Sequence, residues 1–233
     1  MSQSRNESFY AFKEDWSAAQ SIDSCFYFMH EIKKNDTEYV CRYYNKFGPM
    51  VKQEVYRDEA LSIPNGFFCW YNEKGKIDSC GWVLNLRKDG RWSYFIGDST
   101  KETYADDYDN GKFLKREVNL PADTTQREKD ATQKEAVFRH GSNSWLKYIY
   151  ANINVPDRLT KNLGEGKYVV TVSFVVNKTG KVENVFLLKS VEWSADAEVF
   201  KIVETSPDWQ PAIQLGKPVK YRQREDITFS VEK

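Results

Sequence analysis

The sequence lacks the features that mark several large classes of protein. Its acidic and basic residues balance at 34 each, so no net field attracts the chain to nucleic acid or to an anionic membrane surface. No apolar run approaches the roughly 20 residues that a membrane-spanning helix needs. The first ten residues have neither the basic nor the apolar region of a secretory leader. We therefore expect no nucleic-acid partner and no membrane span, and, for a protein outside the cytoplasm, a leader already removed from this sequence.

Metal-binding patterns of cysteine and histidine are also missing. Cys25, Cys41, Cys69 and Cys80 show no CxxC spacing, and the chain has only two histidines, so a structural zinc site lacks its usual ligands. Cys69 and Cys80 flank a turn and could face each other on adjacent strands. A shift of one residue in register would place them on opposite faces, so buried thiols and disulfides both stay open. We predict no metal and no cofactor.

Catalytic and nucleotide-binding motifs are equally scarce. "GEGK" at 164–167 lacks the first glycine and the Ser/Thr of a phosphate-binding loop, and indicates a turn before a strand. "DDYDNG" at 106–111 places a tyrosine where a calcium loop needs an oxygen ligand. His30 lies in an aromatic strand and His140 in a loop, and neither has the third orienting group that a catalytic base needs. We therefore predict that the protein is not an enzyme.

Aromatic residues, in contrast, make up 15% of the chain and concentrate in its first half. "CFYFMHEI" (25–32) and "EYVCRYY" (38–44) flank the turn-forming "KKND". "FFCWY" (67–71) and "KIDSCGWV" (76–83) flank "NEKG" in the same way, and "GRWSYF" (90–95) follows. Aromatic and β-branched residues on either side of a turn predict β-hairpins.

These hairpin segments form a repeat. "YYNKFG" (43–48) matches "WYNEKG" (70–75), "NGFFCWY" (65–71) matches "DGRWSYF" (89–95), and "YDNGKFLKRE" (108–117) is a degenerate copy. Each unit of two aromatics, a turn and a polar strand cannot bury its apolar face alone, so it must stack on its neighbours. The expected product is a long, gently twisted antiparallel sheet.

The repeat pattern is Gly-x-Trp/Phe-x-x-Tyr/Phe followed by Asn-x-x-Gly-Lys, and it resembles the MORN-type repeat in its antitoxin-like variant over about residues 40–117. Its aromatic rows, Trp70, Trp82, Trp92 and Tyr94, could stack on sugar rings or hold a protein partner. In the competing interpretation, alternate members of these rows form the core of the hairpins, because alternate strand residues must face something.

A change of composition divides the chain. Residues 118–137 have almost no large apolar side chains and many charged ones, which is typical of a linker or an exposed helix. We predict a β-rich repeat domain at 1–117, a polar linker at 118–135 and a second domain at 136–233.

The second domain begins with a helical pattern. "SNSWLKYIYANIN" (142–154) has apolar residues at the spacing of an amphipathic helix, with Ser142 and Ser144 as candidate caps. Pro156 is expected to end it. "SADAEVFKIVETS" (194–206) predicts a second helix.

Three strands complete the second domain. The segment from Tyr168 to Val176 is apolar at nearly every residue, which predicts a central strand, and the turn "NKTG" joins it to the next one. "PVKYRQREDITFSV" (218–231) closes the chain as a third strand. A right-handed crossover through the second helix returns this strand beside the first, so the sheet order is 2-1-3 and the last strand is an edge. Trp209 can then cover the sheet face as an apolar plug, while Pro211 prevents the helix from resuming.

This α+β pattern closely resembles the TonB C-terminal domain, over roughly residues 136–233. The segments that carry the resemblance are "AVFRHG", "YIYANINVP", "GEGKYVVTVSFVVNKTGKVENV" and "SPDWQPAIQLGKPVKY". The resemblance implies a periplasmic or envelope protein of a Gram-negative, Bacteroides-type bacterium. It also implies an edge strand that binds an extended peptide, such as a segment of an outer-membrane transporter, by β-strand addition.

We interpret the protein as a non-enzymatic binding module of the cell envelope, and not as the energy transducer itself. The alternatives are an envelope enzyme or a glycan-binding protein that uses the aromatic repeat surface, or a structural scaffold. Whether the chain forms a homodimer stays open. The candidate peptide-binding residues of the edge strand are Val219, Tyr221, Gln223, Glu225, Ile227 and Thr228, with Trp209 and Pro211 as supporting core residues.

Overall fold

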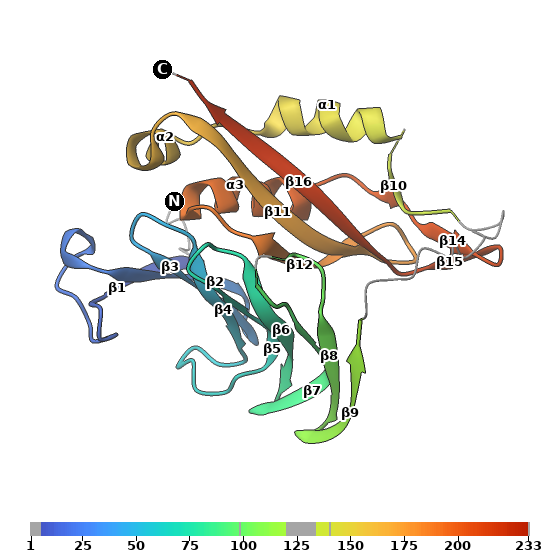
Figure 1. The fold of residues 1–233 in the computed structure, drawn as a ribbon, viewed down its shortest axis with the longest axis horizontal. Coiled ribbons are helices and arrows are strands. Elements are labelled where there is room, and N and C mark those ends of the chain that lie inside the picture. Colours follow the sequence, from blue (N-terminus) through green and yellow to red (C-terminus); the bar gives the residue numbers. More distant parts are fainter. Residues whose placement is uncertain (1–5, 98, 120–133, 140, 233) are drawn as a thin grey trace. The chain divides into compact units, whose positions relative to one another are not determined.

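The computed structural model contains helices and strands in two compact units (Figure 1). It describes residues 6–97, 99–119, 134–139 and 141–232. The first unit consists of Met1–Pro121 with Val191–Trp193, and the second of Ala122–Ser190 with Ser194–Lys233. Most of the linker predicted at 118–135 lies outside the described residues, as does His140.

The first unit is an antiparallel sheet of nine strands whose spatial order follows the sequence, from blue to green in Figure 1. The short connections between aromatic segments explain this order, because strands joined by a tight turn pair with each other. The predicted sheet of hairpins is therefore confirmed. Its strands are β1 (Glu7–Phe12), β2 (Tyr27–Asn35), β3 (Glu38–Asn45), β4 (Met50–Tyr56), β5 (Gly66–Tyr71), β6 (Ile77–Leu84), β7 (Arg87–Tyr94), β8 (Tyr104–Asp109) and β9 (Lys112–Val118), and a 3-10 turn, η1 (Ile22–Ser24), precedes β2.

The apolar core of the first unit uses the aromatic rows. Trp92 is 2% exposed, and its Nε1 donates a hydrogen bond to the carbonyl oxygen of Trp82 at 2.9 Å. Trp70 and Tyr94 pack against the same core, whereas Trp82 is 44% exposed. The rows therefore contribute mainly to the core, and they do not form one continuous surface for sugar stacking. The buried members of this core are Val40, Val55, Phe68, Val83 and Trp92.

All four cysteines are buried free thiols. Cys69 of β5 lies directly opposite Cys80 of β6, as the hairpin predicted, but the two are not bonded. Burial, together with nearby Glu31 and Glu54, raises the pKa of the Cys41 thiol to about 12. Of the two alternatives left open by the sequence, the structure shows the thiols.

The second unit contains a three-stranded antiparallel sheet in the order β12-β11-β16. This order confirms the predicted 2-1-3 arrangement with the apolar strand in the centre. Two short pairs, β10-β13 and β14-β15, accompany it. The elements are β10 (Val137–Phe138), α1 (Ser142–Asn152), α2 (Asp157–Leu163), β11 (Gly166–Val176), β12 (Val182–Lys189), α3 (Trp193–Glu204), β13 (Trp209–Gln210), β14 (Ala212–Gln214), β15 (Lys217–Val219) and β16 (Tyr221–Val231).

The start of the second unit corrects the sequence prediction in two places. Gly141, with φ 95°, is the N-cap residue of α1, so Ser142 and Ser144 lie within the helix and not at its cap position. The helix ends at Asn152, before Pro156 is reached. Pro156 instead precedes a further short helix, α2, which the sequence analysis did not predict. Proline suits this position because the first N–H groups of a helix have no intrahelical partner.

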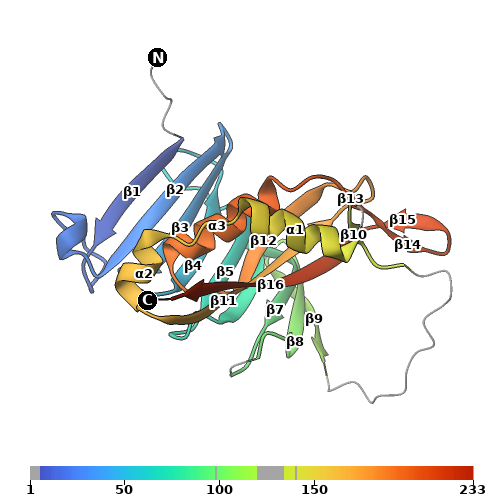
Figure 2. The ribbon, with the colours of Figure 1, turned by 90° about the horizontal axis from the view of Figure 1, so that it is seen from above.

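One face of the sheet carries the core of the second unit. Val170 and Phe174 of β11 are fully buried, and Val170 lies opposite Ile227 of β16 on the same face. Helix α1 lies over this sheet in Figure 2. It is joined to α3 by a hydrogen bond from Tyr148 Oη to the carbonyl oxygen of Ile202, at 3.2 Å. The buried side chains of α3 include Ala195, Val199, Phe200, Ile202 and Val203.

The close contact between Gly81 and Trp92 provides a test of how tightly the apolar core of the first unit is packed. A methyl group at Gly81 would overlap with the indole ring of Trp92. We expect Gly81→Ala to lower the free energy of unfolding by about 3 kcal/mol, because a rigid buried ring must move. At Gly90, where φ is +62° and a Cβ meets nothing within 4 Å, alanine should cost only about 1 kcal/mol of backbone strain. Urea unfolding of both variants checks this difference, and equal losses would contradict it.

Candidate functional site

Strand β16 forms an edge of the sheet in the second unit. It pairs with β11 through all eleven residues, from Tyr221 opposite Val176 to Val231 opposite Gly166, without a register shift. Within the described part of the chain, β16 has no other strand partner. An edge of this length leaves a row of backbone N–H and C=O groups available for a further strand.

A side-chain contact identifies which backbone groups point outward. The hydroxyl of Ser173, on β11, donates a hydrogen bond to the carbonyl oxygen of Gln223 at 3.3 Å, so this carbonyl faces β11. In a regular antiparallel strand, both backbone groups of one residue point the same way and those of its neighbours point the opposite way. The residues that direct their backbone groups to the open edge are therefore Arg222, Arg224, Asp226, Thr228 and Ser230.

The side chains of β16 divide between its two faces. Ile227, Phe229 and Val231 are buried with the core, whereas the even-numbered residues between them are exposed. The guanidinium of Arg222 lies 5.3 Å from the ring centre of Phe186, and its Nη1 donates to Ser173 Oγ at 3.4 Å. These contacts hold the guanidinium of Arg222 over β11 and β12.

The outward segment of β16 is charged. Arg224 Nη2 lies 3.7 Å from Asp226 Oδ1, and both side chains are largely exposed, so this pair adds little stability. Arg224 and Asp226 thus present one positive and one negative group beside the open edge, whereas the guanidinium of Arg222 is directed away from it, toward Phe186 of β12. Such charges both protect an edge from aggregation and select an incoming strand.

A hollow of about 270 Å³ lies where β16 begins. One wall comes from residue Lys134, which pairs with Ile213 through two backbone hydrogen bonds of 3.0 and 2.8 Å. Another comes from Lys220, whose ammonium binds Glu183 of β12 and lowers the pKa of that carboxyl. The lining residues are Lys134, Glu135, Ala212, Ile213, Gln214, Val219, Lys220 and Tyr221.

Trp209 supports the edge from inside the second unit. Its ring, 5% exposed, lies 5.3 Å from Phe138, 5.2 Å from Trp145 and 5.2 Å from Phe174, centre to centre. Its backbone N–H donates to the carbonyl oxygen of Gly180 at 2.8 Å. Trp209 therefore joins α1, the sheet face and the β11–β12 turn, as the sequence predicted for an apolar plug.

Five of the six predicted edge residues lie in β16: Tyr221, Gln223, Glu225, Ile227 and Thr228. Val219 does not. It belongs to β15 and pairs with Ala212, because Leu215 (φ 50°) and Gly216 (φ 73°) turn the chain into a tight hairpin before β16. Pro211 follows Trp209 between β13 and β14, as a half-buried residue.

Arg222, Arg224 and Asp226 lie within the predicted edge strand but are not among the six residues named from the sequence. Those six follow mainly alternate positions, whereas access to the edge depends on the backbone direction at each residue. The available signal was the charge of "RQRED", since charged residues are typical of the open positions of an edge strand.

The other motifs occupy structural positions. Gly164 is the C-cap of α2 and Gly166 begins β11, so "GEGK" is a turn before a strand. Asp106 accepts two hydrogen bonds from Arg116, at 2.6 and 2.9 Å, and Asn110 and Gly111 make the β8–β9 turn. In the described ranges, no three His, Cys, Asp or Glu residues gather as a metal site, and no helix is long and apolar enough to cross a membrane.

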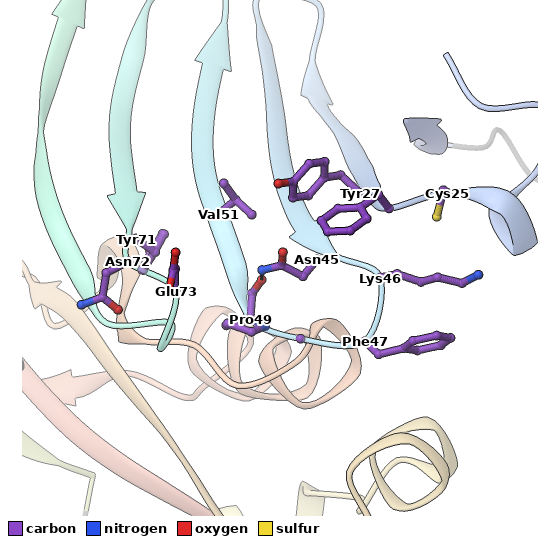
Figure 3. Close-up of a pocket in the computed structure, with 12 residues that line it drawn as sticks. Cys25, Tyr27, Asn45, Lys46, Phe47, Pro49, Val51, Tyr71, Asn72 and Glu73 are labelled. Atoms are coloured by element: carbon purple, nitrogen blue, oxygen red, sulfur yellow. Dashed lines mark hydrogen bonds between the residues drawn. The ribbon is translucent and has the colours of Figure 1, made fainter. Parts of the chain in front are cut away.

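The first unit contains a separate cavity of about 530 Å³ (Figure 3). It lies where β4 and β5 part, since these strands pair only at Lys52–Trp70 and Gln53–Cys69. Beyond these pairs the chain enters the turns at 45–49 and 72–76. The lining residues are Cys25, Phe26, Tyr27, Asn45, Lys46, Phe47, Gly48, Pro49, Val51, Tyr71, Asn72 and Glu73.

Comparison with known proteins places one family on the second unit. Residues 156–231 match the family model described as Gram-negative bacterial TonB protein C-terminal. The matched segment runs from the residue before α2 to the end of β16, so it includes Trp209 and the open edge. It indicates a TonB-like protein-interaction module of the cell envelope, from a family that is not enzymatic in general. A search of curated proteins found no match, and the MORN-type resemblance of the first unit stays a prediction.

A substitution at Gly180 tests whether the position of Trp209 stabilises the second unit. A methyl group at Gly180, where φ is +85°, would overlap with the carbonyl oxygen of Trp209. We expect Gly180→Ala to lower the free energy of unfolding by about 3 kcal/mol, because strain and overlap add. The control is Gly164→Ala, with φ +75° and open space, which should cost about 1 kcal/mol. Chemical unfolding monitored by tryptophan fluorescence measures both, and a Gly180 variant as stable as the control would refute this role.

Proposed function

We propose that the second unit binds an extended protein segment that adds to the open edge of β16 as a further strand. The observation that carries this proposal is the pairing of β16, which extends over eleven residues on one side and lacks a strand partner on the other in the described structure. An added strand satisfies the outward backbone groups from Arg222 to Ser230 without any rearrangement of the core.

Backbone pairing alone supports only modest affinity. Each hydrogen bond contributes about 1 kcal/mol net, while the loss of translational and rotational freedom costs at least about 4 kcal/mol. Side chains of the partner must therefore add affinity and selectivity. Arg224 favours a partner with an acidic residue beside the edge, and the hollow at Tyr221 receives a side chain of a partner that extends past the start of β16.

The family match favours a location in the periplasm or envelope of a Gram-negative bacterium. The partner we propose there is an extended segment of an outer-membrane transporter, the ligand class that the TonB resemblance implies. Because this chain joins the binding unit to a nine-stranded sheet, we propose that it uses the edge for docking and not for energy transduction.

Arg224→Pro tests strand addition at the edge. Proline removes an N–H group that faces outward, so the fold should persist while binding falls at least tenfold. Arg224→Ala is the matched control, because it removes the same side chain but keeps the N–H group. The measurement is quantitative recovery of envelope proteins on immobilised variants, with circular dichroism to confirm that each variant is folded.

Amide hydrogen exchange of the complex gives a second readout. Binding should slow exchange at Arg222, Arg224 and Asp226, whose N–H groups point to the open edge, more than at Gln223 and Glu225. Equal recovery of every partner by the folded proline variant, or protection confined to the first unit, would refute strand addition.

A further inference from the structure

The cavity of the first unit has the size of a small-molecule site. Its volume of about 530 Å³ falls in the range of roughly 300–1,000 Å³ that is usual for ligand pockets. Figure 3 shows Tyr71, Asn72 and Glu73 on one side of the hollow, Val51, Asn45 and Pro49 near its middle, and Lys46 and Phe47 on the other side. All of its lining residues belong to the first unit, so the cavity is independent of the edge of β16.

Aromatic side chains border this cavity and stay accessible to solvent. Phe26 is 47% and Phe47 is 53% exposed. Phe26 meets Tyr27 edge-on, with ring centres 4.8 Å apart. Half-exposed phenylalanines beside a cavity offer flat apolar surfaces at low cost in side-chain entropy, and such surfaces suit a ligand with an apolar ring face.

Two asparagine side chains at the cavity, Asn45 and Asn72, each use one of their two amide groups in hydrogen bonds within their own turn. Asn45 Nδ2 donates to the carbonyl oxygen of Pro49 at 3.0 Å, which leaves Asn45 Oδ1 as an acceptor. Asn72 Oδ1 accepts the backbone N–H groups of Lys74 and Lys76, at 3.0 and 3.1 Å, which leaves Asn72 Nδ2 as a donor. The two turns therefore hold both amides in fixed positions while each keeps one group for a ligand.

Charge at the cavity is balanced. Lys46 donates to the carbonyl oxygen of Asp23 and lies 5.2 Å from the ring centre of Phe47, while Glu73 is an exposed carboxylate. A strongly anionic ligand would meet Glu73, and a strongly cationic one would meet Lys46, so neither is favoured. The balance indicates a neutral ligand that both donates and accepts hydrogen bonds.

We propose that this cavity binds a neutral saccharide. A sugar ring combines an apolar C–H face, which matches Phe47 and Phe26, with hydroxyl groups that both donate and accept hydrogen bonds. Asn45 Oδ1 and the Glu73 carboxylate accept from these hydroxyls, and Asn72 Nδ2 donates to them. The site differs from the aromatic rows considered in the sequence analysis, because none of Trp70, Trp82, Trp92 and Tyr94 lines the cavity.

The experiment uses the full chain and a panel of neutral oligosaccharides built from hexoses and from N-acetylhexosamines, followed by calorimetry with the best binder. Phe47→Ala should weaken binding at least tenfold through the loss of the stacking surface. Asn72→Asp should do the same, because it retains the Oδ1 acceptor that holds the turn but removes the donor. Phe113→Ala is the matched control, since Phe113 in β9 is 51% exposed and lies outside the cavity.

The outcomes separate this proposal from the one for β16. Arg224→Pro should bind the saccharide as the unchanged protein does, so failure of strand addition leaves this test intact. Absence of binding across the neutral panel would overturn the proposal. Equal affinity of the unchanged protein and Phe47→Ala would do so too, as would a preference for charged sugars or for peptides at the same residues.

Discussion

The continuous pairing of β16 with β11 is the constraint on which the second unit depends. Because the register does not shift over eleven residues, side chains and backbone groups alternate strictly along the whole strand. Ile227 and Phe229 enter the core as a consequence, and Arg222 and Arg224 turn their backbone groups to the open side. A slip of one residue would exchange both sets at once, so core and binding edge are specified by the same hydrogen bonds.

Trp209 explains why the chain reaches the edge in this register. Its ring fills the space between α1 and the sheet. Its backbone N–H donates a hydrogen bond to the carbonyl oxygen of Gly180, in the turn between β11 and β12. The end of the crossover is thus attached to the β11–β12 hairpin before β16 starts. The tight β14–β15 hairpin then contains the residues up to Val219, so the edge strand can begin only at Tyr221.

The two units provide recognition by different physical means. The edge of β16 offers backbone groups, which accept many sequences and need side chains such as Arg224 to select among them. The cavity of the first unit offers side chains held by turns, with Asn45 and Asn72 each fixed by one hydrogen-bonding group and available through the other. Buried aromatics such as Trp92 build the sheet that carries those turns, whereas exposed ones such as Phe47 border the cavity.

The sequence by itself determined the hairpins, the central position of β11 and the edge position of the last strand, because apolar periodicity, turn residues and crossover handedness are local or topological rules. It did not determine that Val219 leaves the edge strand or that Arg222 and Arg224 face outward, since both depend on where the β14–β15 turn and the β11–β16 register start. Only the tertiary structure brought Asn45 and Asn72 to one cavity. Those residues are far apart in the chain, and the separation of β4 from β5 that opens the hollow between them is a result of packing.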